Sequence, residues 1–249
     1  MTTPSMLDDK LRELALFEPT PMPVLSVFLN AQANQHGRDE FEPFLRKELK
    51  ARESTFPEGS PERRSFEEDS RKIIAWLQTE LRPSSNGVAL FACSGANGFF
   101  EALQFEAPIQ TNRLYVYHQP HLYSLAKLRD QYATYVAVVA DTNTAHISVF
   151  GLGRTLSTET IVNDKVRSRS QIHGWMLRRY QLHVENYHLR HAKEIVDQLD
   201  RSVREEKANH IILAGDDVIL SVLREQLTPF LKEKVIDVMK LNITTADRD

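Results

Sequence analysis

The strongest structural prediction from this sequence is one long amphipathic helix in the second half of the chain. Apolar residues recur at spacings of 3, 4 and 7 from about residue 174 to about residue 204, which is the period of one buried helical face. The predicted buried residues are Leu182, Leu189, Ala192, Val196, Leu199 and Val203. A helix of roughly 30 residues is about 45 Å long. The polar residues 163–173 before it predict an exposed loop at the end of this helix.

Positive charge is concentrated in this loop and helix. Residues 165–193, here called the basic segment, have a formal charge of +6, although the whole chain has −3. Its cations are Lys165, Arg167, Arg169, Arg178, Arg179, Arg190 and Lys193. A helix N-terminus is already positive, so arginines there do not stabilise the helix. Backbone N–H groups and guanidinium groups both suit phosphates. The segment therefore indicates either a phosphate-bearing partner or a solvated basic face.

Composition limits the remaining classes of protein. A length of 249 residues suits one large or two ordinary domains, and 41% hydrophobic with 26% charged residues is typical of globular proteins. A pI near 6.3 excludes a generally basic nucleic-acid binder. The single cysteine, Cys93, excludes a disulfide framework and lies in an apolar run, as a buried thiol would. The sequence shows no secretory signal and no membrane span. We expect a cytoplasmic protein without membrane partner, metal or cofactor.

Residues 1–132 predict a first α/β domain, with an antiparallel sheet covered by helices. Its expected helices are 5–17, 39–56, 60–81 and 120–132, and its expected strands are 23–30, 87–93, 99–106 and 113–119. Ser60 followed by Pro61 is a typical helix start. Alternation in strand 99–106 predicts a sheet with one face exposed to solvent.

Residues 133–249 predict a second domain with a mixed five-stranded sheet and helices packed on it. The expected strands are 135–142, 145–153, 154–162, 210–215 and 235–241, and the second helix is 218–227 with Asp216 as its N-cap. Strand 135–142 is almost wholly apolar, so we expect it to be buried on both faces. The overall fold class is α/β (α+β).

Several motifs resemble the archaeal and eukaryotic class I release factor superfamily with its rescue relative Pelota, and specifically its bacterial branch. In the first domain these are PVLSVFLN (23–30), the two helices after it, NGVALFAC (86–93) and RLYVYHQ (113–119). The more specific motifs are VAVVADTNTAHISVFGLG (136–153), the basic loop, RRYQLHVENYHLRHAKEIVDQLD (178–200) and HIILAGDD (210–217). The resemblance covers nearly the whole chain.

The resemblance implies a tRNA-shaped protein that binds the ribosome. In that superfamily the N-terminal domain faces the decoding centre. The middle domain has a ribonuclease-H-like topology and carries a Gly-Gly-Gln loop into the peptidyl-transferase centre. A third domain engages a translational GTPase or the ribosomal stalk. This chain ends at Asp249, where the middle domain would end, so we expect that third domain to be absent from it.

The sequence departs from the superfamily at the catalytic motif. His173, Gly174 and Trp175 occupy the position of Gly-Gly-Gln, and a tryptophan stacks on bases rather than placing water. The codon-reading motif has no recognisable counterpart. We therefore expect an A-site occupant acting in ribosome hibernation or rescue, without efficient peptidyl-tRNA hydrolysis. Its RNA-binding residues would be Lys165, Arg167, Arg169, His173, Trp175, Arg178 and Arg179. Its partners would be ribosomal RNA near the peptidyl-transferase centre, P-site tRNA and a translational GTPase.

Other hypotheses remain open at this point. An active peptide chain release factor would hydrolyse peptidyl-tRNA with the 163–175 loop. A protein-interaction module would bind no RNA. Glu185, His188 and His191 have helical metal-ligand spacing, but histidines that face solvent are the simpler interpretation. A nuclease needs clustered carboxylates, whereas Asp141 and Asp216 have easier roles in a turn and at an N-cap.

Overall fold

The computed structural model describes residues 2–32, 41–163 and 175–241, with side chains left undescribed between 175 and 182. The chain forms two compact units. The first unit comprises Met1–Tyr132 together with Leu152–Arg154, and the second comprises Ala133–Gly151 together with Thr155–Asp249. The first unit is thus discontinuous in sequence.

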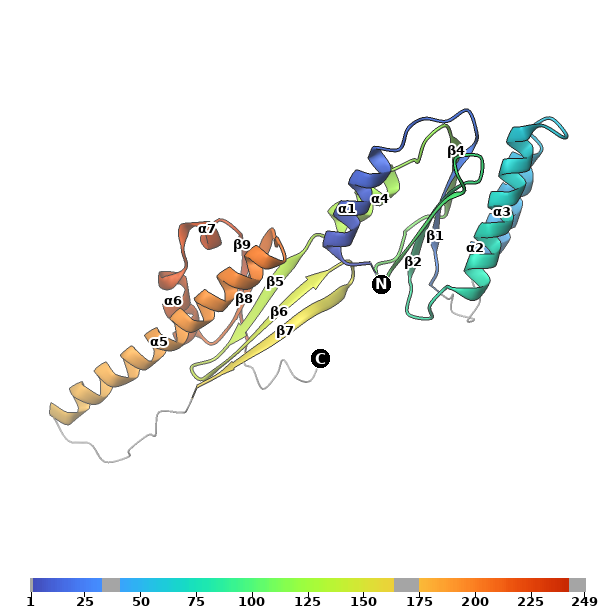
Figure 1. Cartoon of the computed structure of the whole chain (residues 1–249). Helices are drawn as coiled ribbons and strands as arrows, with labels where there is room; N and C mark the ends of the chain where they lie inside the picture. The colour runs from blue at the N-terminus through green and yellow to red at the C-terminus, as the bar shows by residue number, and fades with distance from the viewer. Residues whose placement is uncertain (1, 33–40, 164–174, 242–249) are drawn as a thin grey trace. The chain divides into compact units, whose positions relative to one another are not determined.

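The first unit contains a four-stranded antiparallel sheet in the order β3-β2-β1-β4 (Figure 1). Its strands are β1 (Val24–Asn30), β2 (Gly87–Cys93), β3 (Phe99–Phe105) and β4 (Arg113–Tyr117). Its helices are α1 (Pro4–Ala15), α2 (Phe41–Glu53), α3 (Pro61–Thr79) and α4 (Tyr123–Gln131). The fourth helix begins three residues later than the sequence predicts. The expected antiparallel sheet with helices is therefore confirmed.

Both faces of this sheet are covered, so the prediction of one solvent-exposed face is wrong. Residues Phe28, Ala89 and Phe91 pack with α1 and α4, whereas Val27, Val88 and Leu90 pack with α2 and α3. Figure 1 shows the two helix pairs on opposite sides of the sheet. The misleading alternation lies in β3, an edge strand that is only partly buried on its own. The alternation in β3 therefore reflects its position at the edge of the sheet, and it does not show that one face of the whole sheet is exposed to solvent.

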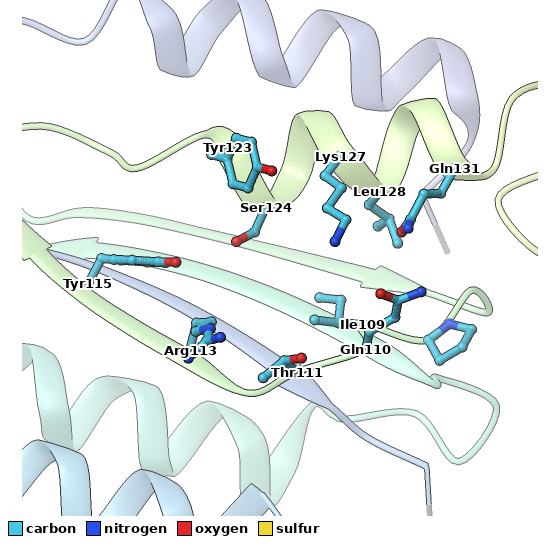
Figure 2. A pocket seen from close by; sticks show the side chains of 11 residues that line it. Ile109, Gln110, Thr111, Arg113, Tyr115, Tyr123, Ser124, Lys127, Leu128 and Gln131 are labelled. Atoms are coloured by element: carbon cyan, nitrogen blue, oxygen red, sulfur yellow. The ribbon is translucent and has the colours of Figure 1, made fainter.

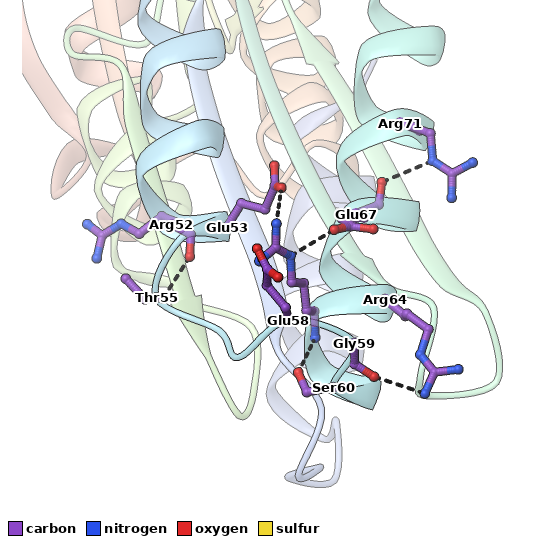
Figure 3. A network of polar contacts seen from close by, with 10 residues as sticks. Arg52, Glu53, Thr55, Glu58, Gly59, Ser60, Arg64, Glu67 and Arg71 are labelled. Carbon is purple, nitrogen blue, oxygen red and sulfur yellow. Dashed lines mark hydrogen bonds and ion pairs between the residues drawn. The ribbon is translucent and has the colours of Figure 1, made fainter.

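Polar contacts fix the start and the middle of α3. The Ser60 hydroxyl accepts a bond from the Arg63 N–H, as predicted for an N-cap. The Arg63 guanidinium is 2.9 Å from a carboxylate oxygen of Glu53 and 2.9 Å from one of Glu67, so it joins α2 to α3. Figure 3 shows Glu53 and Glu67 within this network of polar contacts. Further along α3, the buried Asp69 carboxylate accepts bonds from the Ser94 N–H at 2.8 Å and the Ser94 hydroxyl at 2.6 Å. These bonds hold α3 on the β2–β3 turn.

The second unit contains a mixed five-stranded sheet in the order β7-β6-β5-β8-β9. Its strands are β5 (Tyr135–Ala140), β6 (Thr144–Gly151), β7 (Arg154–Val162), β8 (His210–Gly215) and β9 (Val235–Lys240). Its helices are α5 (Trp175–Glu205), α6 (Asp217–Gln226) and the short α7 (Pro229–Lys232), which the sequence did not predict. β5 pairs antiparallel with β6 and parallel with β8. A meander followed by parallel strands is the ribonuclease-H-like order, so this prediction is confirmed.

The core of the second unit lies on one face of its sheet. Alternate residues of β5 and β6, such as Val138 and Ile147, pack against α5 and α6. The intervening residues are only partly buried, so the prediction that β5 is buried on both faces is wrong. On that second face the Tyr135 and Phe150 rings stack with centroids 5.0 Å apart. The apolar sequence of β5 thus supports one packed face and one partly open face.

The long predicted helix is confirmed as α5, a helix of 31 residues. Of its predicted stripe, the four residues from Ala192 to Val203 are buried and Leu189 is half-buried. The side chain of Leu182 lies outside the described residues. Ile195 is also buried and was missed by the prediction. No helix in the described part of the chain is long and apolar enough to cross a membrane.

Candidate functional site

The predicted RNA-binding residues lie at and before the start of α5. Residues Lys165, Arg167, Arg169, His173 and Gly174 fall outside the described residues. Trp175, Arg178 and Arg179 fall in the first turns of α5, and their side chains are also outside the described part. The functional prediction for these residues therefore stays a prediction. The structure does describe Asn163, just before this segment, and the side chains of α5 from residue 183 onward.

The exposed side of α5 beyond residue 189 has mixed charge. Arg190 and Lys193 are exposed there. They line a groove of about 490 Å³ between α5 and the edge strand β7, together with the acidic residues Glu159, Glu194 and Asp197. The exposed side of α5 is therefore not positively charged along its whole length. If a polyanion binds this unit, the start of the basic segment is the more suitable part.

A hydrogen bond between Asn163 and His191 joins the end of β7 to the middle of α5. Asn163 follows β7 and His191 lies on α5, and the Asn163 Nδ2 donates to His191 Nδ1 at 2.7 Å. The same Nδ2 is 3.0 Å from a carboxylate oxygen of Glu194. The Asn163 backbone N–H also donates to the carbonyl of Asn143 in the β5–β6 turn, at 2.8 Å. One asparagine thus links a strand end, a turn and a helix.

His191 is fully buried, so the prediction of solvent-facing histidines is wrong for this residue. It lies four residues before Ile195 and eight before Leu199, on the buried side of α5. That spacing is the signal by which the sequence could have revealed it. Neither Asn163 nor the role of His191 was anticipated, because their contact joins residues 28 positions apart.

Burial lowers the pKa of His191 below its ordinary value of 6.5, and nearby Glu194 and Asp141 only partly oppose this shift. The hydrogen bond from Asn163 to His191 also favours the neutral ring. Because the amide of Asn163 donates to Nδ1, that nitrogen must be unprotonated, and the neutral ring carries its proton on Nε2. Nε2 is buried without a hydrogen-bond partner among the described residues. A neutral His191 is therefore the form that suits this site.

Asp141 and Asp216 do not form a catalytic pair. The Asp141 carboxylate accepts the backbone N–H groups of Asn143 and Thr144, each at 2.7 Å, and closes the β5–β6 turn. The Asp216 carboxylate caps α6 by accepting the Ile219 N–H at 2.9 Å. Both therefore have the structural roles predicted for them. In the described part of the chain, no three His, Cys, Asp or Glu residues come together as a metal site.

The order of the strands in the second unit and the charge of the basic segment are those expected of a release-factor-like protein. A family profile matches residues 120–249, which is just over half of the chain. The chain belongs to the bacterial archaeo-eukaryotic release factor family 10. The resemblance to the superfamily is therefore confirmed. A comparison with curated proteins finds no significant match.

Solved structures of three related factors align with the chain at low identity. The archaeal translation termination factor aRF1 is 15% identical with a TM-score of 0.41, over 97% of this chain and 66% of its own. Dom34 of S. cerevisiae, described as a translation termination-like factor involved in RNA quality control pathways and interacting with Hbs1, is 11% identical with a TM-score of 0.33, over 66% of this chain and 48% of its own. The Pelota protein of Thermoplasma acidophilum is 14% identical with a TM-score of 0.28, over 66% and 46%. The chain thus spans from about half to two thirds of the length of these factors.

Proposed function

We propose that this protein is a cytoplasmic ribosome-binding factor that occupies the A site during hibernation or rescue, without efficient hydrolysis of peptidyl-tRNA. The family match over residues 120–249 carries the proposal, because it includes the whole basic segment and α5. In this proposal residues 1–132 are the N-terminal release-factor-like domain. Residues 133–249 are the middle domain.

The proposed partners follow from the chemistry of the basic segment. Lys165, Arg167, Arg169, Arg178 and Arg179 would contact phosphates of ribosomal RNA near the peptidyl-transferase centre and of P-site tRNA. His173 and Trp175 would contact bases, since a tryptophan offers a stacking surface. A translational GTPase is included as a further partner. Arg190 and Lys193 are left out of this set, because they share a groove with the acidic residues Glu159, Glu194 and Asp197.

An active release factor is the main alternative. A backbone amide survives any change of side chain, so residues 173–175 would still offer an N–H group to the developing negative charge. The replacement of a glutamine by Trp175 argues against efficient water placement. A protein-interaction module without RNA is the second alternative.

The deciding experiment is co-sedimentation with purified bacterial ribosomes, vacant or carrying peptidyl-tRNA in the P site, with peptide release measured in the same tubes. Binding without release is the expected result. Release would replace the proposal with a peptidyl-tRNA hydrolase. Absence of binding to either ribosome would leave the interaction module as the better hypothesis.

A charge-reversal variant tests the contacts. We expect Arg167, Arg169, Arg178 and Arg179 changed together to Glu to abolish ribosome binding, and the wild-type binding to fall steeply between about 50 and 200 mM salt. The matched control reverses four exposed cations elsewhere, Lys50, Lys207, Arg224 and Lys232. Equal loss of binding in the control would mean that net charge, not the basic segment, is responsible.

Trp175→Ala tests the proposed stacking. We expect about a tenfold or larger loss of ribosome affinity, since one base stack is worth about 1–3 kcal/mol. The melting temperature should change by no more than a few degrees. A large fall in melting temperature with unchanged affinity would instead identify Trp175 as part of the core.

A further inference from the structure

A small pocket in the first unit has a chemistry that the proposed function does not use. It lies between α4, strand β4 and the β3–β4 connection, and its volume is about 180 Å³ (Figure 2). Ser124, Lys127, Leu128 and Gln131 line it from α4, at the spacings of one helical face. Arg113 and Tyr115 line it from β4. Figure 2 shows the polar ends of Ser124, Lys127 and Gln131 directed from α4 toward the strand side.

The charge of the pocket has one sign. Arg113 and Lys127 both line it and both are exposed, and no Asp or Glu is among its described lining residues. Neither cation forms an ion pair within the described part of the chain, although six of the ten described arginines of this unit do. Two unpaired cations beside hydroxyl and amide groups are suited to a phosphate.

Aromatic rings frame the same pocket. Tyr123 lines it and is 68% exposed, so its ring is free to receive a planar group. Tyr115 is held by His121, whose ring stacks on it at 3.7 Å between centroids. Burial lowers the pKa of His121, which keeps that ring neutral. The His121 backbone N–H donates to the Ser26 hydroxyl at 2.9 Å, which fixes this loop on β1. Tyr115 is thereby fixed with its hydroxyl directed toward the pocket (Figure 2).

The size of the pocket decides between a whole ligand and part of one. Pockets for complete small molecules usually measure about 300–1,000 Å³. At about 180 Å³ this pocket holds a single group of a larger partner. We propose that it binds one nucleotide unit of a single-stranded RNA, with Arg113 and Lys127 on a phosphate and a base stacked on Tyr123. This goes beyond the ribosome binding proposed above, because it concerns the first unit and requires no ribosome.

Binding of a short labelled RNA tests this site. Fluorescence anisotropy with a single-stranded hexanucleotide would compare wild type, Arg113→Gln with Lys127→Gln, and Tyr123→Ala. The glutamines remove charge but keep most of each side chain. The matched control, Lys47→Gln with Lys50→Gln, removes two exposed cations from α2 on the other side of the sheet. All variants are made in a chain with Arg178→Gln and Arg179→Gln, to reduce binding by the second unit.

We expect the pocket variants to bind about tenfold or more weakly and the control to bind like its parent. Losing the contact with one phosphate should also reduce the slope of log affinity against log salt by about 0.7. Photo-cross-linking with thiouridine-containing RNA should label the peptide 113–131. Unchanged affinity in the pocket variants, equal loss in the control, or cross-links confined to other peptides would overturn the proposal.

Competition separates an RNA strand from a free nucleotide. A mononucleotide should displace the hexanucleotide only at far higher concentration, and equal potency would overturn the assignment to a strand. The outcome is also independent of the proposed function. If the unchanged protein fails to bind ribosomes but shows pocket-dependent RNA binding, only the proposed function is contradicted. If it binds ribosomes without pocket-dependent RNA binding, only the present proposal is contradicted.

Discussion

At the scale of single residues, His191 connects burial, protonation and a contact between the end of β7 and α5. Its ring accepts the amide of Asn163 at 2.7 Å, and Asn163 is the last described residue before the 164–174 segment. A protonated ring would place N–H against N–H and break this bond. The bond between the end of β7 and the middle of α5 therefore depends on this histidine remaining neutral.

This dependence predicts a pH effect on stability. In the unfolded chain His191 titrates near its ordinary value of 6.5, whereas burial lowers its pKa in the folded protein. The stabilisation is therefore complete above about pH 6.5 and decreases as the pH falls toward the lowered pKa. His191→Asn keeps an acceptor but does not titrate.

Urea unfolding at several pH values measures the effect. The difference in free energy of unfolding between wild type and His191→Asn should be constant above about pH 7 and change below pH 6.5 by up to about 1.4 kcal/mol per pH unit. His183→Asn, an exposed position on the same helix, is the control. Parallel curves for wild type and His191→Asn would contradict the prediction.

At the scale of elements, most helices and strands could be predicted because their signals are local. Ser60 and Asp216 act as N-caps through their own side chains, and the period of α5 is visible along its sequence. Burial was predicted less well, because it depends on the elements packed alongside. The apolar run of β5 is compatible with one or two covered faces, and only the helices decide between them. The four-residue α7 is too short to show a period.

The candidate site was predictable only as a segment. Charge counts identified residues 165–193, because charge is a property of sequence alone. The Asn163–His191 contact was not predicted, because it requires β7 and α5 to lie side by side. The pocket between α4 and β4 was not predicted either, because it combines residues of a helix and a strand whose contact cannot be read from their spacing in the sequence.

The buried stripe of α5 predicts unequal effects of equal substitutions. Leu199 is fully buried in the core of the second unit, whereas Leu189 is half-buried nearer the helix start. Leu199→Ala should destabilise the protein by about 2–5 kcal/mol through lost burial and a cavity. Leu189→Ala should reduce the free energy of unfolding clearly less than Leu199→Ala does. Chemical unfolding followed by circular dichroism measures both, and similar losses would show that the stripe extends evenly toward residue 175.

At the scale of the whole molecule, the first unit depends on residues far along the chain. Leu152 is 1% exposed in its core, and the Leu152 carbonyl accepts the Ala107 N–H at 3.0 Å. Gly153 follows with φ of 81°, and a Cβ there would come within 2.8 Å of the Ala107 nitrogen. The turn at Leu152–Gly153 can therefore pack this closely against Ala107 only because residue 153 is a glycine.

Leu152→Ala should consequently destabilise the first unit by about 2–5 kcal/mol. In a Trp175→Phe background Trp76 is the sole tryptophan, and it lies in α3 of the first unit. Its fluorescence during urea unfolding therefore reports that unit. Leu156→Ala is the matched control, because Leu156 packs against the core of the second unit. A larger shift of the Trp76 transition in the control than in Leu152→Ala would refute the prediction.

The discontinuity of the first unit has a consequence for the order of events during synthesis. Residues 1–132 leave the ribosome before the turn that completes their core. At about 5–20 residues per second, the remaining stretch to Arg154 takes on the order of 1–4 s to be made. During that interval the nascent first unit has an unfilled place in its core. Its final stability is reached only once part of the next unit's sheet has been translated.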